Sequence, residues 1–329
     1  MAWAGQFQKS KLRSGLSMYK YQFTVFTPCY NMAHTIYRVI ESLRRQTFRD
    51  FEWIVVDDGS TDNVYAQIEP VISGQEFPIK FFRHERNLGK PSAINLGVEK
   101  AEGEFFAIVD ADDRMTDDAL EVYHNVYNGL AEDVKNNIAV ITANGKDQHG
   151  NFVGTPFPIP AGGDVIISDI FEMRYRYKVK GEKCNCRKTE VMKEFPFNTS
   201  VDKFVTENTV WFAIAAKYRA VFINRVLRIY YINENPNSLS MTGVKKHPLG
   251  FVFYLEEIIN KYTKKMYLSF FGRIIVYSKF IKYILLAKIK FSAAINKLDR
   301  PHKRFFAYLC IPSGFLAAHI NLHDFEHTS

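Results

Sequence analysis

The sequence predicts an α/β fold in which a mostly parallel central sheet is flanked by helices. Short apolar runs alternate with amphipathic helical segments up to residue 110, a pattern typical of β-α-β units. Each apolar run ends in turn-forming or acidic residues, so each strand is expected to stop abruptly at a polar turn. The length of 329 residues is enough for one large domain or two smaller ones.

Four strands and three helices are expected in the first part of the chain. The apolar runs that predict strands lie at 21–27, 51–56, 79–82 and 105–109. The amphipathic runs that predict helices lie around 36–43, at 64–72 and at 91–100. Right-handed crossovers would bring the carboxyl ends of the strands to one edge of the sheet. In open α/β sheets, that edge is where ligands bind.

The fourth apolar run leads directly into Asp110, Asp112 and Asp113. Carboxylates this close repel one another unless a cation or hydrogen-bond donors neutralise them. Mg²⁺ and Mn²⁺ prefer oxygen ligands, and Mg²⁺ is often held by one or two carboxylates plus substrate phosphates. Two interpretations stay open: a metal-assisted diphosphate site built on Asp110 and Asp112, or a helix start, which also favours acids.

Polar residues at the other strand ends predict a nucleotide site. A nucleotide would lie across the first two ends, where the Asp58 carboxylate could accept from a base N–H. Asn87, Gly89 and Lys90 fall at a predicted helix start, a place that suits an anion. A turn followed by an N-cap also explains the acidic run at 58–62.

Four motifs, taken in order, carry a family resemblance. They are TPCYN at 27–31, VVDDGSTD at 55–62, NLG at 87–89 followed by Ala93, Asn95 and Gly97, and DADD at 110–113. In this order they resemble glycosyltransferase family 2, whose fold is GT-A, over about residues 21–245. The resemblance implies an inverting enzyme that uses a nucleotide-diphosphate sugar, here expected to be a UDP-sugar. A glycan or lipid-linked acceptor in surface polysaccharide synthesis is the expected acceptor.

The resemblance also implies roles for particular residues. In such enzymes the first loop and the aspartate after the second strand hold the base and ribose. The acids after the fourth strand hold ribose and a Mn²⁺ or Mg²⁺ ion. Mapped onto this sequence, the nucleotide-binding residues are Thr27, Pro28, Tyr30, Asn31, Asp58 and Asp110, with Asn87, Gly89 and Lys90 near the phosphates and Asp112 as the metal ligand.

The second part of the chain is expected to supply the acceptor side. A helix around 120–130, a strand at 138–142 and a hairpin with a loop at 150–163 are predicted, followed by strand-like runs at 220–223 and 226–231.

Thr206 would cap a helix to about residue 215. The family usually shows an acidic pair here, whereas this chain has Glu207 and Asn208. Because Asn cannot take a proton, Glu207 is the expected catalytic base; a partner for the helix dipole is the alternative.

The resemblance further implies a flexible loop that closes over the diphosphate. Arg228 and Lys245 would neutralise phosphate, and His247 would complete the metal shell; an ordinary surface histidine is the alternative for His247.

The segment from Lys261 to Arg304 carries 12 of the 43 Lys and Arg residues and one of the 35 acids. From residue 251 onward the pattern is helical, apolar and basic. Two interpretations stay open: a helix in a membrane interface with lysines toward anionic head groups, or a helix packed on the domain with a solvated basic face. Nucleic acid is not an expected partner, because no recognition motif accompanies the charge.

No secretory signal and no uncharged run long enough to span a membrane are found in the sequence. The expected location is therefore the cytoplasm, with peripheral attachment to the cytoplasmic face of the membrane through the basic helices. Cys29, Cys184, Cys186 and Cys310 are expected to be reduced.

The expected division is a flexible arm at 1–20, a GT-A domain at 21–248 and a helical, basic region at 249–329. Within the GT-A domain, 21–115 would bind the nucleotide and 116–248 the acceptor. Two other function classes remain: a metal-dependent nucleotidyltransferase, and a non-catalytic sugar-nucleotide-binding module, which Asn208 would favour. A dehydrogenase is disfavoured, because no Gly-x-Gly-x-x-Gly follows a strand.

Overall fold

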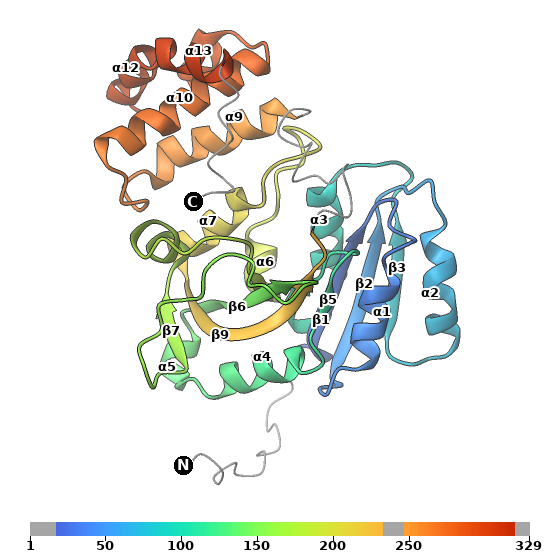
Figure 1. Ribbon diagram of the computed structural model, residues 1–329. Helices are drawn as coiled ribbons and strands as arrows, with labels where there is room; N and C mark the ends of the chain where they lie inside the picture. Colours follow the sequence, from blue (N-terminus) through green and yellow to red (C-terminus); the bar gives the residue numbers. More distant parts are fainter. Residues whose placement is uncertain (1–17, 233–246, 320–329) are drawn as a thin grey trace.

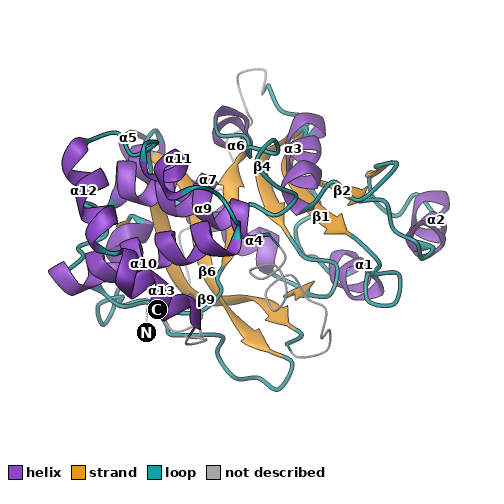
Figure 2. Cartoon of the chain, turned by 90° about the horizontal axis from the view of Figure 1, so that it is seen from above, coloured by secondary structure: helices purple, strands orange, loops and turns teal. Residues whose placement is uncertain are grey.

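A computed structural model of the chain describes residues 18–232 and 247–319. One sheet runs through the molecule, helices cover it, and a group of C-terminal helices lies at one end (Figure 1). Seen from above, these helices lie over the β6 and β9 side of the sheet, away from α2 (Figure 2).

The first part of the sheet is parallel, in the order β3-β2-β1-β4. All seven residues of β2 are buried, as expected for a strand covered on both faces. The register pairs Cys29 with Asp57 and Asp57 with Arg83, so these strands end side by side. The elements are β1 (Tyr21–Cys29), α1 (Tyr37–Arg44), β2 (Phe51–Asp57), α2 (Val64–Ser73), β3 (Ile79–Arg83), α3 (Lys90–Lys100) and β4 (Gly103–Ile108).

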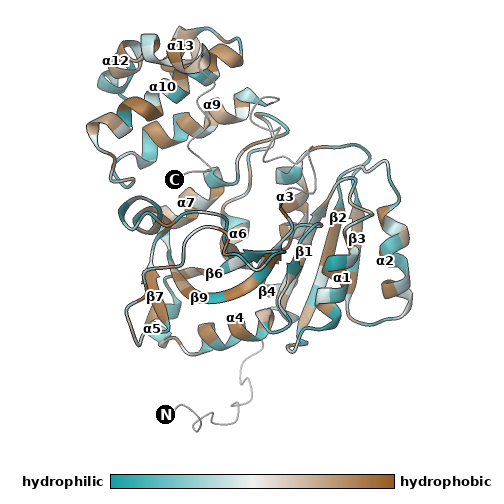
Figure 3. Ribbon diagram, in the orientation of Figure 1, coloured by the Kyte–Doolittle hydropathy of each residue, from teal (hydrophilic) through white to brown (hydrophobic). Residues whose placement is uncertain are grey.

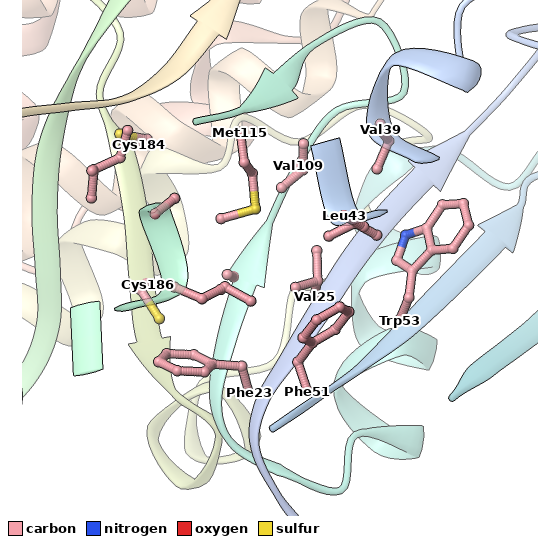
Figure 4. Packing of buried hydrophobic residues seen from close by; sticks show 14 of the residues in the cluster. Phe23, Val25, Val39, Leu43, Phe51, Trp53, Val109, Met115, Cys184 and Cys186 are labelled. Carbon is pink, nitrogen blue, oxygen red and sulfur yellow. The ribbon is translucent and has the colours of Figure 1, made fainter. Parts of the chain in front are cut away.

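The core of this half lies between the sheet and α1. Val39 and Leu43 are spaced one turn apart on α1 and point down onto Val25 and Trp53 of the sheet (Figure 4). A second cluster on the other face packs α3 against Phe26 and Phe106, whose rings stack at 5.1 Å. Both faces of these strands are therefore buried, and only their ends are open to a ligand.

The second part of the sheet is mixed, so the expectation of a mostly parallel sheet holds only for the first part. β8 runs antiparallel to both β4 and β6, and β9 is parallel to β6 but antiparallel to β5 and β7. The elements here are β5 (Arg114–Met115), α4 (Ala119–Asn128), α5 (Glu132–Lys135), β6 (Ile138–Asp147), β7 (Val165–Ser168), η1 (Glu172–Arg176), β8 (Cys184–Lys188), α6 (Thr189–Glu194), α7 (Asn208–Lys217) and β9 (Arg219–Tyr230).

β9 is one continuous strand where two were expected. Its pairing with β6 shifts register between Ala143 and Gly145, and Asn224 and Arg225 in the middle of the strand are exposed. These two polar residues interrupt the apolar pattern, but the bulge keeps the backbone paired on both sides.

The C-terminal helices form a bundle with its own core. They are α9 (Pro248–Glu257), η2 (Ile258–Tyr262), α10 (Phe270–Leu286), α11 (Phe291–Ile295), α12 (Pro301–Leu309) and α13 (Ile311–His319). Phe212 of α7 and Phe171 join this core and pack on Tyr262, at ring distances of 6.0 and 5.6 Å. The bundle is thus fastened to the sheet domain through aromatic rings.

The apolar stripe of helix α10 is packed inside the bundle, which favours the interpretation of a helix packed on the domain. Its residues Tyr277, Phe280, Ile281 and Ile284 are buried, and Figure 3 shows hydrophobic colouring along the ribbon of α10. The apolar stripe packs against α9 and α13, which its length of 17 residues allows it to reach. In the described residues, no helix is both long and apolar enough to cross a bilayer.

All four cysteines are buried and unpaired to one another, as expected for reduced thiols. The division near residue 248 stays a proposal; it coincides with the first residue of α9.

Candidate active site

The first two strand ends are joined by hydrogen bonds. Asn31 adopts the left-handed conformation (φ 55°). Its backbone N–H donates to Ser60 Oγ at 2.9 Å, and its side-chain oxygen accepts from the Thr61 N–H at 2.8 Å. Asn31 thus fixes the loop after β1 to the loop after β2, and this explains why an Asn occupies a position of positive φ.

Thr27 does not belong to the open part of this loop. It is fully buried, and its hydroxyl accepts a hydrogen bond from Trp53 Nε1 at 3.0 Å. Strand alternation points the Thr27 side chain into the core, and the expected contact between Thr27 and a nucleotide stays a prediction. Pro28 is partly buried and Tyr30 is exposed, so these two remain able to contact a ligand.

Asp58 is almost fully engaged with the protein. Its Oδ1 accepts from the Leu88 N–H at 2.9 Å and lies 2.7 Å from His84 Nδ1, and its Oδ2 accepts from the Gly89 N–H at 2.7 Å. The residue is only 3% exposed. Asp58 therefore holds the 84–89 turn in position, and its expected contact with a base stays a prediction.

The start of α3 already binds an anion, and that anion is Asp58. Gly89 is the N-cap, with φ 96°, and its N–H points to the Asp58 carboxylate. The helix continues with Lys90 and Pro91, and proline has no N–H to offer. The expected phosphate site at this helix start therefore lacks its Gly89 donor; Asn87 is partly buried beside it.

Lys90 links the two halves of the candidate site. Its Nζ lies 2.8 Å from Asp110 Oδ1 and 2.8 Å from Glu207 Oε1. Burial opposes the ammonium charge, but the two carboxylates outweigh burial and raise the pKa of Lys90. Lys90 therefore stays charged and holds the strand-end acid and the candidate base together.

Of the three strand-end acids, Asp110 is ionised most readily. Burial opposes its charge, but Lys90 and Arg228 lower its pKa. Burial and the charge of Asp110 raise the pKa of Asp112. Burial raises the pKa of Asp113 to about 8. The protein therefore does not fully stabilise the negative charge of the ionised Asp112 carboxylate.

Arg228 of β9 is the counter-ion of these acids. Its Nη1 lies 4.0 Å from Asp110 Oδ2 and 3.9 Å from Asp113 Oδ2, and its Nη2 donates to the Ile108 carbonyl. Its side chain is about 9% exposed. These contacts leave little of the guanidinium for the expected role in diphosphate binding. Arg228 reaches the acids because β9 passes beside the end of β4.

Glu207 precedes α7 and lies on the wall of a pocket. Its Oε2 accepts from Trp211 Nε1 at 3.3 Å, one helical turn away. The expected cap at Thr206 is wrong: the N-cap position is Glu207 itself, and α7 begins at Asn208. Asn208, which replaces the second acid, accepts from Arg174 Nη1 at 3.4 Å.

The pocket has a volume of about 460 Å³. Its walls combine charged and aromatic side chains from both halves of the chain and from the C-terminal helices, where Phe251 closes one side. The side chains that define it chemically are Lys90, Asp110, Glu182, Lys183, Arg187, Glu207, Trp211, Arg228 and Tyr230. A space of this size suits a small-molecule or sugar ligand.

His247 and Lys245 were expected near the phosphates. Lys245 lies outside the described residues. His247 Nδ1 lies 2.7 Å from Asp202 Oδ1. Among residues 18–232 and 247–319, no three or more His, Cys, Asp and Glu side chains form a group arranged to hold a metal ion. The expected protein ligands of a metal here stay Asp112 and His247, and the substrate phosphates would supply further oxygen ligands.

Sequence reasoning missed two residues of the site. His84 contacts Asp58 and could have been noted as the first residue after the third strand. Arg187 lies over the Trp211 ring at 3.5 Å, and no local signal marks it. Asp113, which was named in the acidic run, accepts from the Tyr231 N–H at 3.2 Å.

Comparison with known proteins identifies relatives of the first half. Residues 24–154 match the family model described as "Glycosyl transferase family 2". Over 140 residues the chain is 30% identical to the UDP-Glc:alpha-D-GlcNAc-diphosphoundecaprenol beta-1,3-glucosyltransferase WfgD of Escherichia coli, covering 43% of this chain and 52% of WfgD. Over 101 residues it is 33% identical to the glycosyltransferase GlyG of Streptococcus pneumoniae, covering 31% and 33%. Across eight of the curated relatives that it matches, the chain spans 14 to 52% of their length.

Solved structures share the fold over most of the chain. S. aureus TarS (residues 1–349) superposes with a TM-score of 0.60 at 17% identity, covering 90% of each chain. The mannosyltransferase PcManGT of Pyrobaculum calidifontis, solved with GDP-Man and Mn²⁺, superposes with a TM-score of 0.50 at 15% identity, covering 93% of this chain and 89% of the other. The predicted α/β fold with a helical C-terminal region is confirmed.

Proposed function

We propose that the chain is an inverting glycosyltransferase that uses a nucleotide-diphosphate sugar, because residues 24–154 match the model of glycosyl transferase family 2. One observation carries this proposal: a single lysine joins the strand-end acid Asp110 to the pocket acid Glu207, at 2.8 Å from each. A donor bound at the strand ends would then present its sugar toward the pocket wall that carries Glu207.

In this proposal the strand-end loops bind the donor. The exposed ring of Tyr30 and the edge of Pro28 offer apolar surface to the base. Asn31 and Asp58 act indirectly, since each holds a loop in position through the hydrogen bonds described above. Asp110 accepts from the ribose hydroxyls, and its lowered pKa keeps it an acceptor at neutral pH.

Glu207 is the proposed general base. Its carboxylate takes the proton of the acceptor hydroxyl as the acceptor oxygen bonds to the anomeric carbon. The bond between that carbon and the donor's phosphate oxygen breaks at the same time, and the nucleoside diphosphate leaves with the bonding electrons. Attack from the face opposite the leaving group inverts the anomeric configuration.

Mn²⁺ or Mg²⁺ is the proposed cofactor, and Asp112 is its proposed ligand. When bound, such an ion stabilises the negative charge of the departing diphosphate. The raised pKa of Asp112 supports this assignment, because a nearby cation would stabilise its ionised form. His247 stays a proposed further ligand: its Nδ1 lies 2.7 Å from Asp202 Oδ1, and metal-bound histidines commonly donate their second ring N–H to a carboxylate.

The proposed donor is a UDP-sugar, and the proposed acceptor is a hydroxyl of a glycan or of a lipid-linked sugar. WfgD supports both, since its name states a UDP-glucose donor and a diphosphoundecaprenol-linked acceptor. The nucleotide-binding role of 21–115 and the acceptor role of 116–248 are part of the same proposal.

A donor screen tests the proposed function. The purified chain is incubated with a panel of nucleotide sugars, with Mn²⁺, Mg²⁺ or EDTA, and the released nucleotide is measured. We expect a nucleoside diphosphate from one donor, in the presence of metal only, and NMR of the product should show an inverted anomeric centre. Pyrophosphate as product would instead indicate a nucleotidyltransferase, and binding without release under every condition would indicate a non-catalytic module.

A further inference from the structure

The C-terminal bundle exposes large apolar side chains outside its own core. Phe270 and Phe271 open α10, and Phe305, Tyr308 and Leu309 lie on α12; we call these five residues the aromatic patch. Phe271 is 74% exposed, Phe305 66% and Leu309 60%. Single exposed apolar residues are ordinary in proteins, but a cluster of them marks an interaction site.

The patch is not a by-product of packing α12. This helix already buries an inner face, where Ala307 and Cys310 are in the core and the Phe306 ring packs on Tyr277 at 4.8 Å. Phe305, Tyr308 and Leu309 follow the spacing i, i+3, i+4, so they share a second, outward face. These three side chains lie outside the buried core of the bundle.

Ring contacts connect the two helices of the patch. The Phe270 ring lies 6.0 Å from that of Phe306 and 6.0 Å from that of Phe271. The start of α10 and α12 therefore meet through the contact between Phe270 and Phe306, and Phe306 is the neighbour of Phe305 in the chain. They belong to one surface region of the bundle.

The charge around the patch has one sign. Lys264, Lys265, Arg273 and Arg300 are exposed. Asp299 is the single acid between residues 261 and 304, and Lys303 neutralises it at 2.8 Å. The first turns of α10 and α12 contain no acid. An apolar surface bordered by cations is complementary to an anionic surface with an apolar interior.

We propose that the aromatic patch and its basic border form a docking surface for an anionic phospholipid membrane. Aromatic and aliphatic side chains would enter the boundary between head groups and acyl chains, and the cations would contact the head groups. The surface is formed by helix ends and one outer helix face, rather than by the long apolar stripe of α10 that is buried in the bundle.

A second copy of the chain fits this surface less well. Two copies docked through their patches would oppose two strongly basic segments, and like charges across an interface disfavour association. Single-stranded nucleic acid would match the charge, but Leu309 and the helical presentation of the rings suit an acyl layer better than stacked bases.

Vesicle binding by the full chain tests the proposal. The probes are vesicles of phosphatidylcholine alone and vesicles that also contain phosphatidylglycerol, with the bound fraction measured by sedimentation at low and high salt. We expect binding to the anionic vesicles only, weakened by salt. The triple variant F271S/F305S/L309S should lose about tenfold in affinity for each residue, and K264Q/K265Q/R273Q about fivefold for each.

A matched control is F152S, which removes an aromatic side chain that is 48% exposed on the sheet domain and should bind vesicles like the unaltered chain. Because the patch lies outside the proposed active site, nucleotide release from the donor should be unchanged in the triple variant. Loss of membrane binding and failure of the proposed activity are therefore separate results.

Several results would overturn the proposal. The unaltered chain could stay in the supernatant with anionic vesicles, or the triple variant could bind them as tightly as the unaltered chain does. The unaltered chain could also bind neutral and anionic vesicles equally. A dimer in light scattering that the triple variant dissociates would assign the patch to a second copy. If the unaltered chain binds an oligonucleotide and only the triple variant loses this binding, the patch would be assigned to nucleic acid.

Discussion

Lys90 Nζ lies 2.8 Å from Glu207 Oε1, so a residue of the nucleotide-binding half holds the acid proposed as catalytic base. The same amino group lies 2.8 Å from Asp110. The lysine is thus shared by two carboxylates that are 97 positions apart in the sequence. The proposed donor side and acceptor side of the site are coupled through one side chain.

The first prediction concerns this lysine. Lys90→Met leaves Asp110 and Glu207 without their common cation, so we expect the rate of sugar transfer to fall by about 10² or more. The free energy of unfolding should fall by about 1–3 kcal/mol, because two partly buried acids lose their partner. Steady-state kinetics and urea unfolding measure both. Lys90→Arg, which keeps the charge, is the control and should retain more activity; a Met variant with full activity would remove Lys90 from the mechanism.

The second prediction concerns the base. Glu207→Gln keeps the shape of the side chain but cannot accept the proton, so kcat should fall by about 10²–10⁴, while donor affinity measured by calorimetry stays nearly unchanged. Glu182→Gln is the matched control, since Glu182 is another carboxylate of the pocket wall, and it should keep its activity. If the two variants behave alike, Glu207 has no special role.

The third prediction concerns the metal. Asp112→Asn should weaken the binding of Mn²⁺ to the nucleotide-bound chain, as followed by the EPR signal of free Mn²⁺, and should abolish transfer. Asp117→Asn removes an acid five positions along the chain that pairs with Arg45 on the surface; it should bind Mn²⁺ normally. Undiminished Mn²⁺ binding in the Asp112 variant would contradict our ligand assignment.

The fourth prediction concerns Gly89, which has φ 96° and whose added Cβ would lie 1.9 Å from the Lys203 carbonyl oxygen. Gly89→Ala should destabilise the chain by more than about 2 kcal/mol, because a backbone clash adds to the strain of a left-handed alanine. Gly150→Ala is the control: its φ is 90°, but nothing lies within 4 Å of the added Cβ, so it should cost only about 1 kcal/mol. Equal losses in urea unfolding would show that the close approach is absent.

The fifth prediction concerns pH. Burial lowers the pKa of Lys183 to about 8, from 10.5. Between these pH values the unfolded chain binds a proton that the folded chain does not, so this residue makes the free energy of unfolding rise with pH. The neutral amine can still donate to Asn144 Oδ1 and to the Thr155 carbonyl, at 3.0 and 2.6 Å.

The comparison with Lys183→Met isolates this effect. The stability of the unaltered chain relative to the variant should increase as the pH rises from about 8 toward 10.5. Urea unfolding of both proteins across this range measures the difference. A difference that is constant with pH would mean that Lys183 titrates normally.

Much of the nucleotide-binding half could be predicted from local pattern. Its inner strands are buried on both faces, so they are mostly apolar, and their helices repeat apolar residues every third or fourth position. β8 could not be predicted in this way. Its sequence, CNCRK, mixes polar and small residues, and it is a strand because β4 and β6 pair with it on both sides.

The positions of the polar residues could likewise be predicted from the sequence, but their contacts could not. Sequence alone brought Asp58, Asp110 and Asp112 to one edge of the sheet, because parallel strands with right-handed crossovers must end together. It did not give their partners. Asp58 holds a turn, and Arg228 neutralises two acids, because these charges are buried and a buried charge takes the nearest complementary group.

The sequence by itself therefore determined the resemblance to glycosyltransferase family 2, the run of strands and helices in the first half and the edge that carries the acids. Only the tertiary structure decided that Lys90 joins Asp110 to Glu207, that Thr27 faces the core, and that the apolar stripe of α10 is buried while Phe271, Phe305 and Leu309 are exposed. The physical reason is the sequence separation of the interacting residues. The periodicity of strands and helices depends on neighbouring residues, whereas ion pairing and burial depend on which distant segments the fold brings into contact.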